Sequence, residues 1–245
     1  MIAWRLERFE ALPSTSDFCI LRAKAGEPEG LAVFCARQTA GRGSRGRSWE
    51  SGVGNVALSV LLRPAITPAQ SGMFPLLAGV AVVQAIGEAL PAGVKAMLKW
   101  PNDVLIEGAK CAGLLIDAAP LGNRVDWLVI GMGINVAFAP VVAGRAVTCL
   151  AAHGAKLTAE QLAAAVLARL AEALQIHQEY GAGLTIERWM SQAHPFGSEM
   201  AVKVGETAVK GRFEGLSAGG ELMLRVGKRI ESFSTGEILL GWKEE

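Results

Sequence analysis

Residues 95–130 read KAMLKWPNDVLIEGAKCAGLLIDAAPLGNRVDWLVI, and four short apolar runs within this stretch have the character of β-strands. They cover about 95–100, 104–106, 113–117 and 126–130. The segments that join them, Pro-Asn-Asp, Glu-Gly-Ala and Leu-Gly-Asn, are too short to hold the crossover helices that parallel strands require. Consecutive strands are therefore expected to run in opposite directions. The stretch predicts an antiparallel meander.

The flanking segments predict further strands and two helices. A short apolar run at 31–36 and an alternating segment at 55–62 are typical of buried and half-buried strands. Apolar residues recur at helical spacing from 76 to 90, where Pro-Ala-Gly ends the pattern. Thr158 is placed to cap an amphipathic helix over 159–180. The larger part of the chain is therefore predicted to combine a sheet with helices.

The pattern changes after Trp189. Short alternating apolar runs follow, and glycines at 205, 211, 215, 219, 220 and 227 separate them. This pattern is typical of a small all-β barrel of about fifty residues. Because no long linker precedes it, we expect the barrel to pack on the larger part of the chain.

Composition excludes several classes of protein. The 245 residues are 51% hydrophobic and carry a net charge of +1, which argues against global disorder and against a broad nucleic-acid-binding face. The four cysteines are scattered and the three histidines do not cluster, so neither a disulfide framework nor a zinc site is expected. The N-terminus lacks a signal-peptide core, and the longest apolar runs are too short to span a bilayer. We expect a cytoplasmic protein with no membrane partner.

The sharpest concentration of positive charge is Gly-Arg-Gly-Ser-Arg-Gly-Arg-Ser-Trp at 41–49, within a stretch from 38 to 54 that has almost no anchoring residues. Glycine permits close backbone approach to a ligand, and arginine presents donors suited to phosphate and carboxylate groups. A solvated turn and an RNA-binding arginine–glycine segment are alternatives. We favour a loop, free in its middle, that orders over a phosphate-bearing ligand.

Three further polar stretches follow in order. Lys-Trp-Pro-Asn-Asp at 99–103 places a cation, an amide and a carboxylate at a proline-containing turn. Lys110 is followed three residues later by Gly113, and Gly-Met-Gly-Ile-Asn stands at 131–135. The last segment lacks the third glycine and the following helix of a dinucleotide fingerprint. Each of these signals is weak when taken alone.

Taken together and in this order, these stretches resemble the biotin protein ligases. That family has a glycine–arginine loop ending in tryptophan, a Lys-Trp-Pro-Asn-Asp turn, a Lys-x-x-Gly segment and a Gly-x-Gly-Ile-Asn segment. Ser14 and Thr15 match part of its Ser-Thr-Asn turn, and Gln38 matches the glutamine before the loop. Thr-Gly-Glu-Ile at 235–238 resembles its closing strand. The resemblance extends from about Phe9 into the C-terminal region.

The resemblance implies both a fold and an activity. The fold is α+β, with a mixed, largely antiparallel sheet flanked by helices over 1–192 and a small SH3-like β-barrel over 193–245. The activity is an ATP-dependent ligation: biotin and ATP form biotinyl-5′-AMP, and biotin then passes to one lysine of a biotin carboxyl carrier protein of acetyl-CoA carboxylase or a related carboxylase. Mg²⁺ would be held mainly through the ATP phosphates, without dedicated protein ligands.

The resemblance also assigns site residues by position. Residues expected to contact biotin are Ser14, Thr15, Ser16, Gln38, Gly41, Arg42, Gly43, Ser44, Trp49, Lys110 and Gly113. Residues expected to contact ATP or the adenylate are Arg45, Arg47, Trp49, Lys99, Asn102, Gly133 and Asn135. Catalytic roles fall to Lys110, Arg42, Arg45 and Asp103, the last as the group that orients or deprotonates the carrier lysine.

Two positions depart from the family pattern. Ser44 stands where the family has an arginine, which predicts weaker retention of the adenylate, and Ser16 stands where it has an asparagine. Because the resemblance begins within the first few residues, no N-terminal helix-turn-helix and no nucleic-acid partner are expected. The pattern leaves open whether the protein is a monomer or a homodimer. A lipoate or octanoate ligase of the same fold, and a non-enzymatic anion- or RNA-binding module, are the alternatives.

Overall fold

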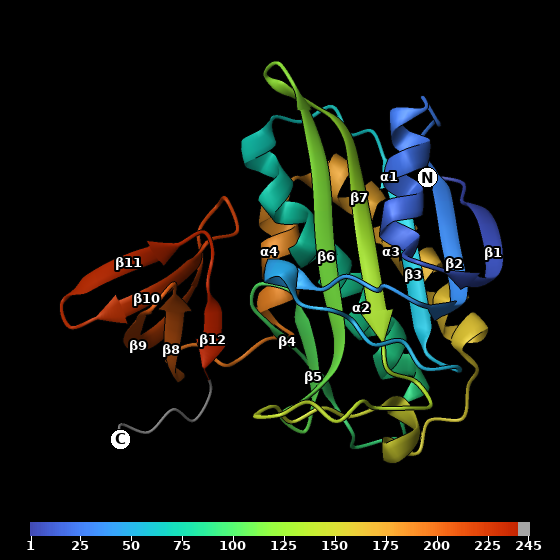
Figure 1. Ribbon diagram of the computed structural model, residues 1–245. Helices are drawn as coiled ribbons and strands as arrows, with labels where there is room; N and C mark the ends of the chain where they lie inside the picture. The colour runs from blue at the N-terminus through green and yellow to red at the C-terminus, as the bar shows by residue number, and fades with distance from the viewer. Residues whose placement is uncertain (240–245) are drawn as a thin grey trace.

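The computed structural model describes residues 1–239 and contains two β-sheets (Figure 1). The larger sheet has seven strands in the order β1-β2-β3-β7-β6-β5-β4, and the smaller has five in the order β11-β10-β9-β8-β12. The strands of the larger sheet are β1 (Arg5–Leu12), β2 (Leu31–Gln38), β3 (Val56–Leu62), β4 (Ala96–Lys99), β5 (Asp103–Ile106), β6 (Ala109–Leu121) and β7 (Arg124–Ile134). Those of the smaller sheet are β8 (Glu199–Val204), β9 (Thr207–Leu216), β10 (Leu222–Val226), β11 (Arg229–Phe233) and β12 (Glu237–Leu239).

The predicted meander is confirmed. Strands β4, β5, β6 and β7 pair consecutively and antiparallel, and β7 then pairs antiparallel with β3. One pair breaks this pattern, because β1 and β2 are parallel. Helix α1 (Thr15–Lys24) makes the crossover that a parallel pair requires. The sequence prediction contained neither β1 nor α1, and together they make the sheet mixed.

Three helices cover one face of the larger sheet and α1 covers part of the other (Figure 1). These three are α2 (Phe74–Ala89), α3 (Ala159–Tyr180) and α4 (Ala182–Met190). The predicted helix over 159–180 is confirmed, with a capping box formed by Thr158 and Gln161. Short 3₁₀ turns complete the elements: η1 (Ser44–Gly46), η2 (Pro68–Met73) and η3 (Leu150–His153).

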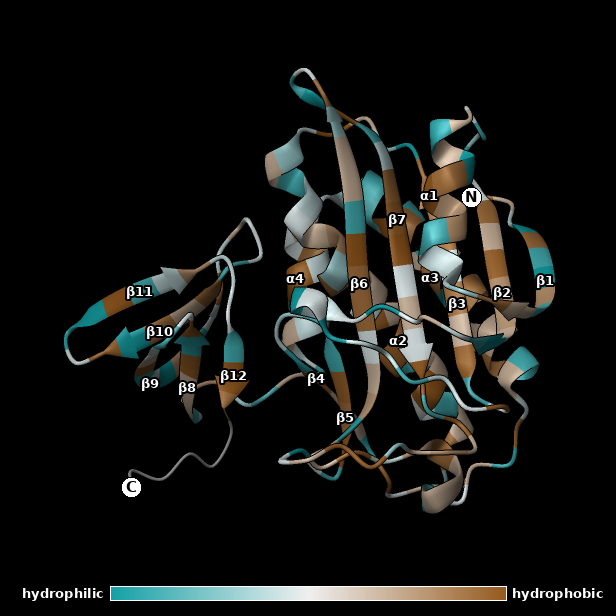
Figure 2. Ribbon diagram, viewed as in Figure 1, coloured by the Kyte–Doolittle hydropathy of each residue, from teal (hydrophilic) through white to brown (hydrophobic). Residues whose placement is uncertain are grey.

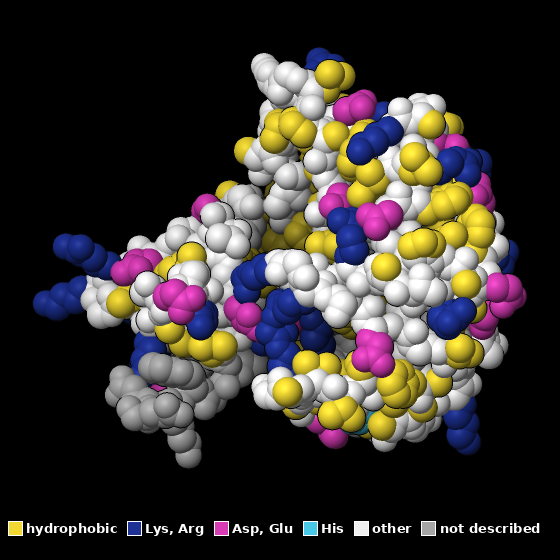
Figure 3. Space-filling view, in the orientation of Figure 1, with side chains coloured by type: hydrophobic (Ala, Val, Ile, Leu, Met, Phe, Trp, Pro, Cys, Tyr) yellow, Lys and Arg dark blue, Asp and Glu magenta, His cyan; other side chains and the backbone are white. Residues whose placement is uncertain are grey.

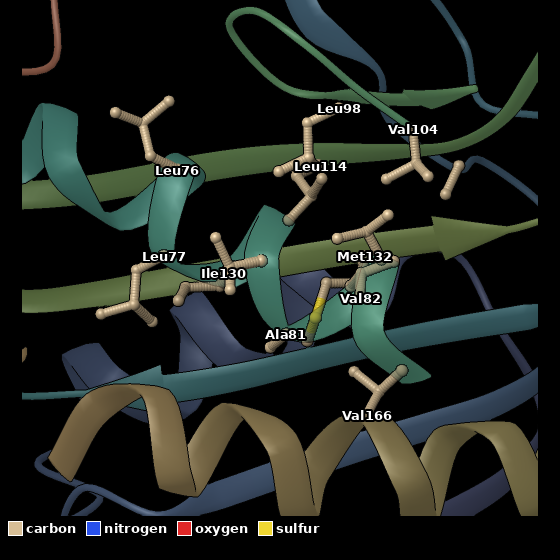
Figure 4. Packing of buried hydrophobic residues seen from close by; sticks show 14 of the residues in the cluster. Leu76, Leu77, Ala81, Val82, Leu98, Val104, Leu114, Ile130, Met132 and Val166 are labelled. Carbon is tan, nitrogen blue, oxygen red and sulfur yellow. The ribbon is translucent and has the colours of Figure 1, made fainter. Parts of the chain in front are cut away.

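Helix α2 is the centre of the main hydrophobic core. Figure 2 shows it as an apolar helix behind apolar strands, and Figure 4 shows its Leu77 and Val82 beside Ile130 and Met132 of the sheet, with Val166 of α3 on its other side. The segment Pro68–Ala89 is long and apolar enough to cross a membrane by length and composition alone, but 67% of its most apolar window is buried within the protein. These properties are those of a core helix.

The smaller sheet is antiparallel and is consistent with the predicted SH3-like domain. Within residues 1–239, however, β11 pairs only with β10 and β12 pairs only with β8, so the predicted barrel is not closed. The three described residues of β12 all pair with β8. Residues 240–245, which the prediction assigned to the same domain, lie outside the described part of the chain.

Candidate active site

The floor of the site is a row of glycines on the sheet face opposite α2. Leu114 and Met132 belong to the core under α2, so their neighbours Gly113 and Gly133 present the other face. These two glycines are paired across β6 and β7. Without side chains, they leave the sheet surface open to whatever lies on it.

The arginine–glycine loop lies on this floor as a tight hairpin. Trp49 N donates to Gly41 O at 2.8 Å, and Gly43 N donates to Arg47 O at 2.7 Å. The turn uses positive φ at Arg45 (59°) and Gly46 (72°), which matches the twist of a hairpin. The Trp49 indole packs so closely on Gly133 that a Cβ there would overlap the ring. The expectation of a loop free in its middle is therefore wrong, because the hairpin is held by side-chain contacts that the sequence does not reveal.

One cavity lies between the hairpin, α1 and the glycine floor. Twelve of the residues that the sequence predicts for the site line it: Ser14, Thr15, Ser16, Gln38, Arg42, Gly43, Ser44, Trp49, Asn102, Lys110, Gly113 and Gly133. The structure thus brings together nearly all of the residues expected at biotin, and places Asn102 and Gly133, both expected at the adenylate, with them.

A second cavity adjoins the first. Gly43, Ser44, Trp49 and Lys110 line both cavities, so they stand at the junction. The second cavity alone is lined by two residues expected at ATP, Arg47 and Asn135, and by residues that the sequence did not single out: Ser48, Glu50, Pro140, Val142, Arg145 and Val147. Two compartments therefore meet at Trp49 and Lys110.

The α1 end of the first cavity holds a chain of hydroxyl groups. Thr15 N and Thr15 Oγ1 both donate to Gln38 Oε1, at 2.8 and 3.1 Å. The Thr15 hydroxyl lies 2.7 Å from Ser59 Oγ, which lies 3.0 Å from Ser16 Oγ. Sequence reasoning missed Ser59, because a single serine in the apolar strand β3 carries no motif. Ser14 caps α1 and accepts from Asp17 N at 3.2 Å.

Arg42 has two carboxylate partners that the sequence did not indicate. Its Nε lies 2.9 Å from Asp17 Oδ1 on α1, and its Nη2 lies 2.5 Å from Asp117 Oδ2 on β6. These ion pairs attach the start of the hairpin to two separate elements. Arg42 is thereby fixed at the rim of the first cavity, which it lines.

Lys110 is held beside Trp49 and Asp103. Its ammonium forms an ion pair with the Asp103 carboxylate and lies 5.5 Å from the centre of the Trp49 ring, within the range of a cation–π contact. Lys99, at the end of β4, lines neither cavity and is partly buried. Burial lowers the Lys99 pKa more than nearby Asp103 and Glu237 raise it.

Glu237, in the smaller sheet, forms ion pairs with three arginines from the larger part of the chain. Arg145 lies at 2.5 Å, Arg45 at 3.1 Å and Arg47 at 3.5 Å from its carboxylate oxygens. Burial raises the Glu237 pKa, but Arg145, Arg47 and Arg45 outweigh it, so the net shift is downward. Figure 3 shows lysine and arginine side chains gathered in the hollow beside the smaller sheet. Arg45, predicted to be catalytic, thus contacts Glu237 and lines neither cavity.

Two buried asparagines form hydrogen bonds that hold the backbone beside the second cavity in place. Asn135 Nδ2 donates to Thr148 O at 3.0 Å. Asn55 Oδ1 accepts from the backbone nitrogens of Val136, Ala137 and Phe138 at 2.9–3.1 Å. Sequence reasoning missed Asn55. The available signal was an asparagine at the start of a strand, because asparagine is typical of turns.

The sequence model of the biotin/lipoate A/B protein ligase family matches residues 9–135, which hold most of the residues lining the first cavity. The chain belongs to this family. A "Bifunctional ligase/repressor BirA" of Bacillus subtilis is 33% identical over 95% of this chain and 73% of its own length. A "Biotin--[acetyl-CoA-carboxylase] ligase" of Mycobacterium tuberculosis is 31% identical over 96% of this chain and 89% of its own length.

Solved structures of family members have the same fold. A biotin protein ligase from Aquifex aeolicus, in complex with biotin and ATP, superposes with a TM-score of 0.80 at 27% identity. The match covers 96% of this chain and 97% of the other. It therefore includes the smaller sheet as well as the larger one, and the α+β fold that the resemblance implied is confirmed.

Proposed function

We propose that this chain activates biotin with ATP to biotinyl-5′-AMP and then transfers biotin to a lysine of a carrier protein. The observation that carries this proposal is the pair of adjoining cavities that meet at Trp49 and Lys110. Such a reaction needs one compartment for the acid and one for the nucleotide, with the carboxylate and the α-phosphate at their junction. The relatives' names, biotin ligases of carboxylases, agree with this chemistry.

The first step is an attack by the biotin carboxylate on the α-phosphorus, and pyrophosphate leaves. The acid is its own nucleophile, so the site has to supply positive charge rather than a nucleophilic side chain. Lys110 at the junction and Arg42 at the rim of the first cavity would stabilise the charge on the reacting phosphate. Arg47, beside the second cavity, would contact the departing pyrophosphate, and Mg²⁺ would enter with the ATP phosphates.

The second step is an attack by the carrier lysine amine on the acyl carbon, and AMP leaves. Asp103 is the carboxylate held next to Lys110, and we assign it the role of orienting or deprotonating that amine. Ser14, Thr15, Ser16 and Gln38 form the polar end of the first cavity and would bind the ureido ring. Asn135, on the wall of the second cavity, would contact the adenine.

A lipoate or octanoate ligase is the second candidate in this family. Its substrate has an apolar or disulfide-containing end. The far end of the first cavity is lined by hydroxyl and amide groups, which would lose their hydrogen bonds to water and gain no partner from such a substrate. Pyrophosphate exchange into ATP separates the candidates: we expect exchange with biotin and none with lipoate or octanoate. Exchange with lipoate alone would favour the second candidate, and exchange with neither acid would favour a binding module.

The remaining assignments follow from the same proposal. The carrier would be the biotin carboxyl carrier domain of acetyl-CoA carboxylase or a related carboxylase, and the reaction would take place in the cytoplasm without nucleic acid. We divide the chain into a catalytic domain over 1–192 and an SH3-like domain over 193–245, between α4 and β8. Size-exclusion chromatography with light scattering would distinguish a monomer from a homodimer.

A further inference from the structure

Ser59 is completely buried and does not line the cavity, but it touches two residues that do. Its hydroxyl lies 2.7 Å from that of Thr15 and 3.0 Å from that of Ser16. It stands on β3 opposite Gly131 of β7. A Cβ at Gly131 would overlap Ser16 Oγ, so the glycine leaves room for this group of hydroxyls.

The direction of each hydrogen bond in this group can be worked out. The Thr15 backbone N–H must meet an acceptor, so the amide oxygen of Gln38, not its nitrogen, faces Thr15. Three oxygen–oxygen contacts then connect Gln38, Thr15, Ser59 and Ser16. Only three hydroxyl protons are available, since the Gln38 oxygen carries none. Each contact receives one proton only if Ser16 donates to Ser59, Ser59 to Thr15 and Thr15 to Gln38.

This order decides what the cavity offers a ligand. The protons of Ser16 and Thr15 are used within the protein, so their oxygens can only accept from a ligand. Ser14 already accepts from Asp17 N, so its own proton stays available to donate. Donors and acceptors are thus fixed at separate positions before any ligand arrives.

We propose that Ser59 is a positioning residue that fixes this polarity, so that Ser16 accepts a hydrogen bond from a ring N–H of the cyclic urea of biotin. The proposal rests on the proposed function and adds a determinant of specificity to it. A buried acceptor with no proton to donate rejects a ligand that presents an oxygen in place of the N–H, because two lone pairs then face each other.

The test compares biotin with its two cyclic carbamate analogues, in each of which one ring N–H is replaced by oxygen. Pyrophosphate exchange into ATP gives kcat and KM for each acid. We expect the wild-type protein to prefer biotin over at least one analogue by about 100-fold or more. In Ser59→Ala, Ser16 regains a free proton and can donate to the ring oxygen. The preference should then fall at least about tenfold, and the KM for biotin should rise while kcat stays within about twofold.

A matched control removes a buried hydroxyl elsewhere. Thr185 of α4 is buried and its hydroxyl lies 2.9 Å from His177 Nδ1, in the helical layer on the other face of the sheet. Thr185→Val should leave the preference for biotin unchanged. If Ser59→Ala does not fold, Ser59→Cys replaces it, since a thiol is a weak donor and should give an intermediate preference.

Unchanged preference in the Ser59 variant would overturn the proposal, and so would an equal loss in Thr185→Val. Failure of the proposed function would be distinct, because the wild-type protein would then show no biotin-dependent exchange, and the role of Ser59 would be refuted with it.

Discussion

The Lys110 ammonium, at the junction of the two cavities, forms an ion pair with the Asp103 carboxylate, which lines neither cavity. Asp103 pairs with Gly113 of β6, and Lys110 pairs with Leu105, two residues further along β5, so the register of this antiparallel pair sets the two side chains close together. A carboxylate in this position can hold the lysine in place during the first step and meet an incoming amine during the second.

Asp103→Asn should slow transfer of biotin from preformed biotinyl-5′-AMP to the carrier. The amide keeps the size of the side chain but removes the basic oxygen, and general-base contributions are about 10²–10⁴-fold. Single-turnover transfer with purified adenylate isolates this step from adenylation. Transfer at the wild-type rate would refute the role of Asp103 in the second step.

Ser44→Arg should retain biotinyl-5′-AMP longer than the wild-type protein. Ser44 lines both cavities, and an arginine there could reach the adenylate phosphate. We expect about tenfold slower release, which corresponds to about 1.4 kcal/mol, and less biotin on a bystander protein. Ser48→Arg, in the same hairpin, is the matched control because Ser48 lines only the second cavity. Equal bystander labelling by all three proteins would contradict the prediction.

Gly133→Ala should impair the site without unfolding the protein. A Cβ there overlaps the Trp49 indole, so the hairpin must shift, and misplacement of about 1 Å can cost about 100-fold in rate. The measurement is biotin-dependent pyrophosphate exchange. Gly87→Ala is the control, since a Cβ at this position of α2 meets no atom within 4 Å. Wild-type exchange in Gly133→Ala would show that the contact between Trp49 and the sheet is dispensable.

Glu237→Gln should loosen the hairpin from the smaller sheet. The three arginines lose their shared charge, and a loss of about 1 kcal/mol opens a closed state about fivefold more often. Trypsin cleaves after arginine, so cleavage at Arg45 and Arg47 should accelerate by about the same factor. Glu206→Gln, in the turn between β8 and β9, should leave the rate unchanged. Equal cleavage in both variants would argue against the attachment.

Folding stability should fall as the pH drops below 6.5, in part because of His194. Burial lowers the His194 pKa from its usual 6.5, and Lys99 lowers it further. Below pH 6.5 the unfolded chain therefore binds the proton more readily than the folded chain, and stability decreases by at most about 1.4 kcal/mol per pH unit for this group. Urea unfolding at pH 7.5 and pH 5.5 measures the loss. His194→Asn should reduce it, and an unchanged loss would exclude His194 as a contributor.

The repeating elements could be predicted because their signals are local. Strand alternation and short turns in 95–130 predicted the meander, and a capped apolar stripe predicted α3 with its observed bounds. Strand β1 and helix α1 were missed, since β1 is an exposed, charge-rich edge strand and α1 has only a weak apolar stripe. Their structure depends on tertiary pairing with β2 and β3 rather than on local pattern.

By itself, the sequence determined the family, the order of the motifs and the types of residue in the site, because each motif is a short run of residues. The tertiary structure alone decided which groups meet. Ser59 reaches Thr15 across 44 positions, and Glu237 reaches Arg45 across 192. Hydrogen bonds and ion pairs depend on distances of about 3 Å between side chains, and strand register, not sequence order, sets those distances.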